Sequence, residues 1–233
     1  MSRIIEAFPK SNLKCKVFIV QIIPAILTAD KKTVENKLVK FRSVFDWLQI
    51  DVTDGVFVDN PTLSLEQFRN FPDLRYFKLD IHLMVNNPIS FLPGCQKLKA
   101  KRATGQIEMM PNQTEFVQKI IDLKMNPGLA VDLPTPIEKI DQKLFPKLDI
   151  ILLLTAKAGF GGQKFQLSVL NKIKKLSKIK KEKGFNFKIG LDCGINPSTI
   201  EMGYEAGADV FYAASYIAKE PKQALKELQK AVL

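Results

Sequence analysis

Eight short segments rich in apolar, β-branched and aromatic residues recur at regular intervals along the chain. They span residues 17–27, 44–52, 76–85, 103–110, 128–133, 148–156, 187–194 and 208–215. Between most of them, apolar residues repeat with helical spacing, as in 29–41, 114–124 and 197–207. Eight strands alternating with helices over this length predict the α/β class and, within it, a single (β/α)8 barrel, the TIM barrel.

The alternative α/β architecture is a doubly wound sheet, which usually carries a glycine-rich turn after its first strand. The corresponding stretch here, "PAILTAD" at 24–30, contains no glycine, so this alternative is weak. The chain contains no linker or low-complexity segment that divides it. We therefore expect one TIM-barrel domain over residues 17–233, preceded by an N-terminal extension over residues 1–16.

The sequence indicates the cellular environment in which the protein works. The sequence lacks the run of about 18 apolar residues that a membrane span needs, and its N-terminus lacks a signal-peptide pattern. Cys15, Cys95 and Cys193 are widely spaced and form no C-x-x-C pair, which argues against a disulfide framework and a zinc knuckle. We expect a cytoplasmic protein without a membrane partner.

The chain is basic, with a formal net charge of +11 that raises the question of a nucleic-acid partner. The densest run of lysines lies in "NKIKKLSKIKKEKG", residues 171–184. In and next to this run Leu170, Ile173, Leu176 and Ile179 recur with helical spacing, which indicates an amphipathic helix with lysines on its solvated face. We therefore do not expect a nucleic-acid partner, and polyanion binding stays an alternative.

In a TIM barrel the chemistry sits at the carboxyl ends of the strands. Polar residues gather at these predicted ends: Gln49, Asp51, Asp80, His82, Gln106, Glu108, Asp132, Thr155, Asp192 and Ser215. Two carboxylates and the only histidine of the chain, in Asp51, His82 and Asp192, form a ligand set suited to a divalent cation. We expect these three side chains to converge, with Asp54 and Gly55 forming the turn that follows Asp51.

Two glycine-containing turns follow late strands. The loop "KAGFGGQKF" at 157–165 carries Gly159, Gly161 and Gly162, and "DCGINPST" at 192–199 leads into a predicted helix. Glycines allow backbone N–H groups to approach an anion, and a helix N-terminus favours negative charge. Together these turns predict a phosphate site of the kind found after the last strands of TIM barrels.

Six stretches in a fixed order resemble the ribulose-phosphate 3-epimerase family, from about Ile22 to the C-terminus. They are "PAILTAD", "WLQIDVTDGVFVDN", "DIHLMV", "TAKAGFGGQKF", "GLDCGIN" and "GADVFYAASYIA", of which "DIHLMV" and "GFGGQKF" are nearly verbatim. The resemblance implies a TIM barrel that interconverts ribulose 5-phosphate and xylulose 5-phosphate, or acts on a related ketose phosphate, by removing and returning the proton at carbon 3. It also implies a divalent metal (Zn, Fe, Mn or Co) that stabilises the enediolate.

The resemblance assigns roles residue by residue. Asp51 and Asp192 match the two acid/base aspartates and, with His82, three of the four metal ligands. The positions that match substrate or phosphate contacts are Ala25, Gly159, Phe160, Gly161, Gly162, Cys193, Gly194, Ala214 and Ser215. We also expect a sugar-phosphate substrate and a homo-oligomer.

Several positions depart from the family pattern around the same site. Gln49 stands where the family has its fourth ligand, a histidine, so we expect a weak ligand and a weakened metal site. Other departures are Ala25 for Ser, Thr53 and Leu154 for Met, Asp59 and Ala158 for Pro, and Cys193 and Ala214 for Gly. A catalytically impaired barrel that binds a sugar phosphate is therefore an alternative. Decarboxylases of the orotidine-phosphate type are disfavoured because "DIHLMV" lacks their reactive lysine.

Overall fold

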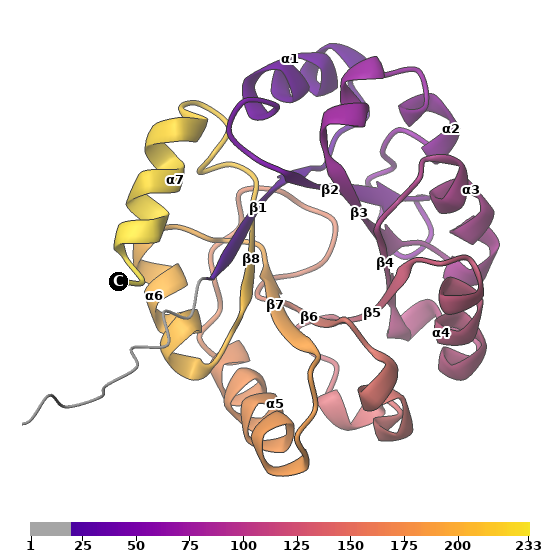
Figure 1. Cartoon of the computed structure of the whole chain (residues 1–233), viewed down its shortest axis with the longest axis vertical. Helices are drawn as coiled ribbons and strands as arrows, with labels where there is room; N and C mark the ends of the chain where they lie inside the picture. Colours follow the sequence, from indigo (N-terminus) through magenta and orange to yellow (C-terminus); the bar gives the residue numbers. More distant parts are fainter. Residues whose placement is uncertain (1–19) are drawn as a thin grey trace, which may run out of the picture.

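The computed structural model describes residues 20–233, and the expected extension over residues 1–16 lies outside this range. Eight parallel strands close into a barrel in sequence order, with β1 pairing with β8 (Figure 1). The strands are β1 (Gln21–Ile26), β2 (Trp47–Thr53), β3 (Lys78–Met84), β4 (Arg102–Gln106), β5 (Asn126–Val131), β6 (Ile150–Leu154), β7 (Lys188–Asp192) and β8 (Val210–Ala213). The predicted TIM barrel is confirmed, with each strand inside its expected segment to within two residues.

Helices connect the strands on the outside of the barrel. In the described residues the α-helices are α1 (Lys31–Phe41), α2 (Leu65–Phe68), α3 (Leu92–Lys97), α4 (Gln113–Asp122), α5 (Val169–Lys183), α6 (Pro197–Ala206) and α7 (Pro221–Lys230). Short 3-10 turns are η1 (Pro72–Tyr76), η2 (Pro88–Phe91), η3 (Ile107–Met109), η4 (Ile137–Lys139) and η5 (Gln142–Lys147). The connection from β5 to β6 consists of η4 and η5 instead of an α-helix.

Local sequence sets the helix ends. The Asp30 side chain accepts a hydrogen bond from the Thr33 backbone N–H and caps α1. Asn196 caps α6 in a reciprocal arrangement with Thr199, and Pro197 occupies the first helical position. Gly184 ends α5 in the left-handed conformation. Within the described residues no helix combines the length and apolar character needed to cross a membrane.

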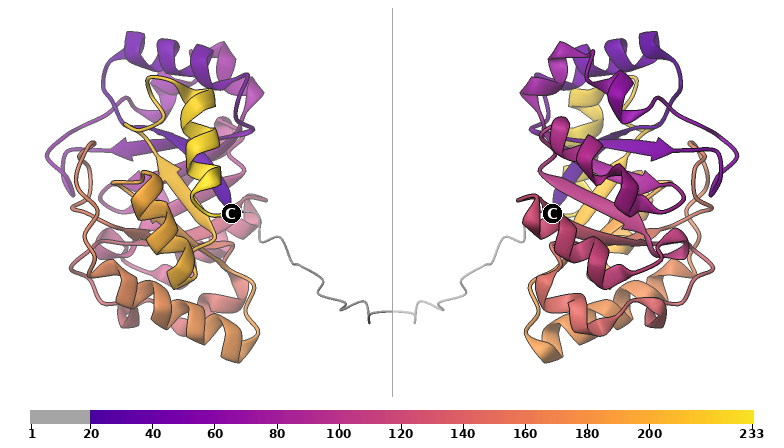
Figure 2. Two further views of the ribbon diagram at one scale, coloured as in Figure 1. Left: turned by 90° about the vertical axis from the view of Figure 1, so that its left-hand side faces the viewer. Right: turned by 90° about the vertical axis from the view of Figure 1, so that its right-hand side faces the viewer.

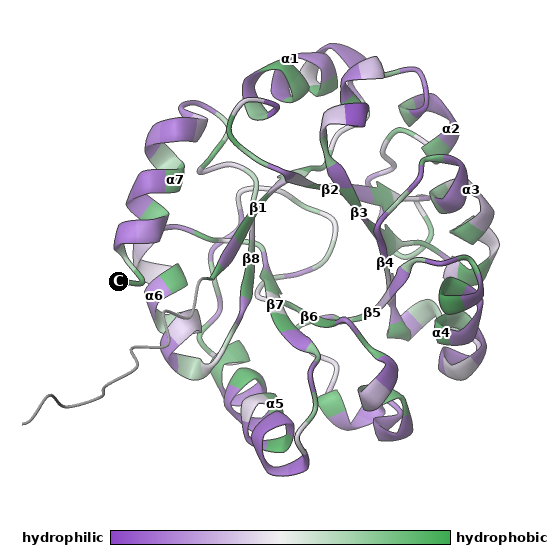
Figure 3. Ribbon diagram, in the orientation of Figure 1, coloured by the Kyte–Doolittle hydropathy of each residue, from purple (hydrophilic) through white to green (hydrophobic). Residues whose placement is uncertain are grey.

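Side-chain alternation along each strand separates two interiors. In β2, Leu48, Ile50 and Val52 belong to the core between sheet and helices, whereas the alternate residues Gln49 and Asp51 point into the barrel. β6 is apolar and buried throughout, as expected for a strand covered on both faces, and is green along its length in Figure 3, where α7 is mostly purple.

A buried ionic cluster fills the amino-terminal end of the barrel. The Arg102 guanidinium donates to Asp80 at 2.9 Å, to Asp149 at 2.7 Å and to the Tyr212 hydroxyl at 2.8 Å. It also lies 4.8 Å from the centroid of the Trp47 ring. Although burial lowers the pKa of Arg102, the charges of Asp80, Tyr212 and Asp149 raise it overall, so the group stays charged.

The opposite end of the barrel is the mouth, where the strands terminate. The side views in Figure 2 show the long loops that follow β2 and β6 gathered at this end. The loop after β2 contains the expected Asp54–Gly55 turn, and the loop after β6 carries the glycines expected to bind phosphate.

Candidate active site

Three predicted metal ligands meet inside the barrel mouth. Asp51 on β2 lies in register with His82 on β3, and Asp192 is the last residue of β7. Each offers one ligand atom, and these atoms lie within 4.8 Å of one another. All three residues are buried. The expected convergence of Asp51, His82 and Asp192 is therefore present.

The orientation of His82 follows from its two neighbours. Its Nδ1 atom lies 3.0 Å from Asp51 Oδ1 and 3.8 Å from Asp192 Oδ2. On the other side of the ring lies the Gln106 amide, which has hydrogen-bond partners for both its oxygen and its nitrogen in only one orientation. In that orientation its oxygen accepts from His82 Nε2 at 3.2 Å and its nitrogen donates to Glu108 at 2.7 Å. The Nε2–H group is thus held by Gln106, and Nδ1 is left to face the two carboxylates.

Gln49 joins the two carboxylates. Its side-chain Nε2 donates to Asp51 Oδ1 at 2.9 Å and to Asp192 Oδ2 at 2.7 Å. Its Oε1 atom is buried and has no hydrogen-bond partner among the described residues. The amide therefore presents N–H groups, and not its oxygen, to the carboxylates.

Close packing of like charges changes the protonation of the site. Burial and the negative charge of Asp51 raise the pKa of Asp192 to about 7. Burial alone lowers the pKa of His82, but the hydrogen bond to Asp51 and the charges of Asp51, Asp192 and Asp80 raise it overall. Near neutral pH the site therefore holds protons that it can exchange.

The predicted phosphate residues surround a small cavity beside the carboxylates. Its volume is about 40 Å³, and both Asp51 and Asp192 reach it. Its lining contains Gly159, Phe160, Gly161, Gly162, Cys193, Gly194, Ala214 and Ser215, together with Leu27, Met84, Leu154 and Ile195. Of the expected substrate contacts, Ala25 is not in the lining; it is buried in β1, in register with Gln49.

Cys193 takes an unusual backbone conformation at the edge of this cavity. Its φ angle is 79°, in the left-handed region that favours glycine. Its N–H donates to Asp192 at 2.7 Å, and its carbonyl accepts from the Thr155 hydroxyl at 2.6 Å. Burial, followed by the charges of nearby carboxylates, raises the pKa of its thiol well above the ordinary range. The thiol therefore stays protonated and is a poor nucleophile.

Two loops meet over the mouth. The Asn60 side chain, after β2, donates to the Gly159 carbonyl, after β6, at 2.7 Å. Val58 packs with Met84, Leu154 and Ala158 in a small apolar cluster separate from the main core. The Val58 side chain lies so close to Gly159 that a Cβ there would come within 2.0 Å of it. These contacts hold the loops after β2 and β6 together beside the cavity.

Comparison with known proteins identifies the family. The model of the Ribulose-phosphate 3 epimerase family matches residues 21–218. The chain belongs to this family. A ribulose-phosphate 3-epimerase of Bacillus subtilis is 34% identical over 217 residues, which cover 90% of this chain and 98% of the relative. A "Ribulose-phosphate 3-epimerase, cytoplasmic isoform" of Oryza sativa is 32% identical over 224 residues, which cover 91% of this chain and 94% of the relative. The protein is an epimerase-like isomerase.

Solved structures of lower identity share the barrel. A 3-hexulose-6-phosphate synthase aligns over 91% of this chain and 100% of its own, with a TM-score of 0.61 and 16% identity. A thiamine phosphate pyrophosphorylase of Pyrococcus furiosus aligns over 92% of this chain and 96% of its own, with a TM-score of 0.58 and 13% identity. At this identity the likeness shows the fold alone.

The ligand geometry of this epimerase-family site fits a divalent metal at three positions. Two carboxylate oxygens and one imidazole nitrogen converge, and Gln106 fixes the ring through its other nitrogen, as an outer hydrogen-bond partner of a metal-bound histidine does. The fourth position differs because Gln49 turns its amide nitrogen toward the carboxylates. Gln106 was noted from the sequence only as a strand-end residue, and its contact with His82 had no sequence signal.

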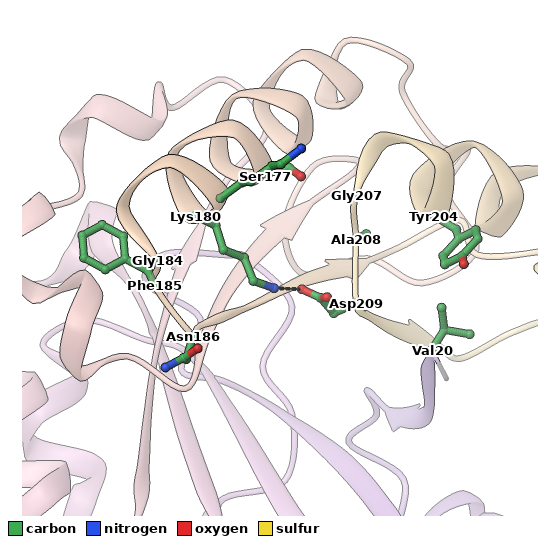
Figure 4. A pocket seen from close by; sticks show the side chains of 11 residues that line it. Val20, Ser177, Lys180, Gly184, Phe185, Asn186, Tyr204, Gly207, Ala208 and Asp209 are labelled. Carbon is green, nitrogen blue, oxygen red and sulfur yellow. Dashed lines mark hydrogen bonds and ion pairs between the residues drawn. The ribbon is translucent and has the colours of Figure 1, made fainter. Parts of the chain in front are cut away.

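A larger pocket lies at the opposite end of the barrel from the mouth, between the ends of α5 and α6 and the starts of β7 and β8 (Figure 4). Its volume is about 550 Å³. The Lys180 ammonium there donates to Asp209 at 2.8 Å, so the two charges neutralise each other. Because the pocket is remote from the convergent carboxylates, it is not the candidate active site.

Proposed function

We propose that this protein interconverts ribulose 5-phosphate and xylulose 5-phosphate, or a related pair of ketose phosphates, by proton transfer at carbon 3. The observation that carries the proposal is the meeting of Asp51 and Asp192 inside one barrel mouth. Membership of the family and the names of its relatives in Bacillus subtilis and Oryza sativa support the substrate class.

Inversion of a carbon by proton transfer requires one acid/base group on each face of a planar intermediate. β1 and β8 lie between β2 and β7 in the barrel (Figure 1). Asp51 on β2 and Asp192 on β7 therefore start from different positions around the ring. In the proposed reaction Asp51 serves one face of the substrate and Asp192 the other. In the metal-free site, burial and the charge of Asp51 raise the pKa of Asp192 to about 7, so this carboxyl gains and loses a proton near neutral pH.

Asp51, His82 and Asp192 would hold the divalent metal, for which Zn, Fe, Mn and Co are the candidates. Gln49, expected from the sequence to be a weak fourth ligand, would have to turn its amide oxygen inward to reach the metal. When bound, such a metal supplies electrostatic stabilisation of the oxygen that becomes negative during proton removal. Gln106 holds the Nε2–H of His82 and thereby keeps the imidazole in a fixed orientation.

We assign the phosphate to the two glycine turns after β6 and β7. Gly194 precedes α6 in a left-handed conformation with φ of 62°, close to the helix N-terminus that Asn196 caps. A Cβ on Gly194 would come within 2.6 Å of the Phe165 backbone nitrogen, so the two turns are in direct contact. Contact between the two turns supports this assignment, because a phosphate held by the backbone N–H groups of both turns requires them to lie side by side.

The proposal is tested by incubating the protein with ribulose 5-phosphate in heavy water, with chelator or with each candidate metal. We expect deuterium to enter at carbon 3 and xylulose 5-phosphate to form. Absence of exchange with every metal would refute the epimerase proposal. The Oryza sativa relative, a cytoplasmic isoform by name, supports a cytoplasmic location. The homo-oligomer stays a prediction, which light scattering would test.

A second candidate function is binding of a sugar phosphate without turnover. It is favoured by the Gln49 amide, which stands at the fourth ligand position and turns its nitrogen toward the carboxylates. Calorimetric binding of ribulose 5-phosphate without any proton exchange would support it. Polyanion binding is less favoured because Lys172, Lys175 and Lys180 on the lysine-rich helix already bind carbonyl or carboxylate oxygens.

A further inference from the structure

The Gln49 side chain occupies the space between the two carboxylates. The residue is wholly buried on β2, in register with Ala25 on one side and Asp80 on the other. It has no exposed surface through which its amide could reach solvent. Its hydrogen bonds are therefore confined to the interior of the barrel.

The two hydrogen bonds of Gln49 use oxygens that a metal would need. Asp51 Oδ1 accepts from Gln49 Nε2 at 2.9 Å and lies 3.0 Å from His82 Nδ1. Asp192 Oδ2 accepts from the same Nε2 at 2.7 Å and lies 3.8 Å from His82 Nδ1. A nitrogen that donates to both oxygens stands where a cation would neutralise both charges.

An amide has one donor end and one acceptor end, and only the oxygen can bind a cation. Turning Oε1 toward Asp51 and Asp192 would break both hydrogen bonds. It would also place the partial negative charge of the amide oxygen beside two carboxylates. That arrangement is favourable only with a cation between them. With its nitrogen inward, Gln49 opposes metal entry; its buried Oε1 lacks a protein partner among residues 20–233.

We propose that the Gln49 amide is a built-in competitor of the divalent metal: it cross-links Asp51 and Asp192 in the metal-free protein and must be displaced when a metal binds. Gln49 is then a positioning residue that lowers metal affinity and keeps the two carboxylates together without a metal. This inference rests on the metal site of the proposed function and is independent of the substrate.

The competitor role and a ligand role for Gln49 make opposite predictions for Gln49→Leu, which keeps a similar volume but has neither donor nor acceptor. Loss of a ligand would weaken metal binding. Loss of a competitor would strengthen it, because two hydrogen bonds to charged groups no longer have to be broken. Gln49→His is expected to tighten binding under both roles and cannot separate them.

The experiment is calorimetric titration of chelator-treated protein with Mn²⁺ and with Zn²⁺. We expect Gln49→Leu to bind at least about tenfold more tightly than the unsubstituted protein. We also expect its metal-free form to have a lower Tm, because the two carboxylates have lost their shared donor. Equal or weaker metal binding by Gln49→Leu would overturn the proposal.

A matched control is Thr104→Val, a near-isosteric loss of a buried hydroxyl on β4 that has no protein hydrogen-bond partner in the described chain. We expect its metal affinity to be unchanged, which separates the effect of Gln49 from a general change in barrel polarity.

If Gln49→Leu does not fold, crystal structures of the unsubstituted protein with and without Mn²⁺ decide the question. We expect both bonds from Gln49 Nε2 to the carboxylates to be lost on metal binding, and their persistence beside a bound metal would overturn the proposal. Failure of the epimerase assay would leave both measurements intact, so the two proposals fail independently.

Discussion

Asp51, Asp54 and Asp192 are three carboxylates near one mouth, and their contacts give them different roles. Asp51 and Asp192 face each other across the Gln49 amide. Asp54 instead accepts from the Val56 N–H at 2.9 Å and from the Asn86 N–H at 2.7 Å, which joins the loops after β2 and β3. The turn role expected for Asp54 agrees with these contacts.

We expect Asp51→Asn and Asp192→Asn each to abolish epimerisation, because inversion needs an acid/base group on both faces. Each variant should exchange a proton only from the face whose carboxylate survives, which deuterium incorporation measures. Metal content must be compared first, since both residues are proposed ligands. Asp54→Asn, which keeps one acceptor oxygen for the loop, is the control and should retain most activity. Full epimerase activity in metal-loaded Asp192→Asn is incompatible with the mechanism.

The raised pKa of Asp192 predicts how stability depends on pH in chelator-treated protein. The pKa rises from 3.8 for an ordinary carboxyl to about 7 in the folded state. Between these values the folded protein binds more protons than the unfolded chain, so this group's contribution to the free energy of unfolding falls as pH increases. We expect urea denaturation to show this fall from about pH 4 to pH 7. Asp192→Asn should flatten it, and an unchanged slope would contradict the assignment.

At the residue scale the sequence predicted which side chains meet but not how the amides among them are turned. Asp51, His82 and Asp192 could be found because barrel strands of known order bring their ends together. The direction of the Gln49 amide depends on hydrogen-bond partners on both β2 and β7. The role of Gln106 depends on its contact with His82. Such contacts leave no periodicity in a single sequence.

Helix α5 shows that two lysines of one lysine-rich face can have different roles. Lys172 donates to the carbonyls of Asp132, Leu133 and Thr135 at 3.0, 2.6 and 2.6 Å, and so ties the loop after β5 to the helix. Lys175, one turn further, is exposed and pairs with Glu138. The sequence predicted the solvated face correctly but could not single out Lys172.

We expect Lys172→Met to lower the free energy of unfolding by about 2 kcal/mol, because hydrogen bonds from a charged group are lost and three carbonyls need new partners. The control Lys175→Met, which breaks an exposed ion pair, should change it by less than about 1 kcal/mol. Urea denaturation of both variants measures the difference. Equal losses would show that the carbonyl contacts of Lys172 contribute no more than a surface pair.

The glycine turns at the mouth differ in how tightly they are packed. Gly194 has φ of 62°, and an added Cβ would meet the Phe165 backbone at 2.6 Å, whereas Gly161 has open space around it. We expect Gly194→Ala to destabilise the protein by more than about 2 kcal/mol, because backbone strain and a backbone clash combine. Gly161→Ala should be nearly neutral. Thermal unfolding compares the two, and similar Tm values would contradict the observed contact.

Element boundaries were predictable only approximately. The segment 103–110 was expected to be one strand, but β4 ends at Gln106 and Glu108 lies in η3. The apolar pattern continues past the strand because Ile107 is buried in the core from within the 3-10 turn. Burial alone does not specify backbone conformation, which is why the pattern overran the strand.

For the whole molecule, the order and number of strands followed from the sequence because each strand is an apolar segment flanked by helical spacing. The contact between the loops after β2 and β6 did not follow, since Asn60 and Gly159 are 99 residues apart. The buried ionic cluster at the other end was also unforeseen, because Arg102 stands at the edge of a segment and resembles a surface residue in sequence.

We expect Arg102→Met to lower the free energy of unfolding by about 3–5 kcal/mol, because Asp80 would remain as a buried charge without its partner. The double variant Arg102→Met with Asp80→Leu should recover a large part of this loss, since no uncompensated charge is left. Urea denaturation of the single and double variants completes the comparison. A double variant less stable than Arg102→Met would show that the cluster itself stabilises the barrel.

The chain contains one histidine and one tryptophan, and the fold places them at opposite ends of the same barrel. The imidazole lies among the carboxylates at the mouth, and the indole stacks on the guanidinium at the base. Magnetic resonance of the ring nitrogens and intrinsic fluorescence therefore each give a signal from a single place without any introduced label. A ligand that shifts the first signal and leaves the second unchanged has acted locally, whereas loss of both together reports global unfolding.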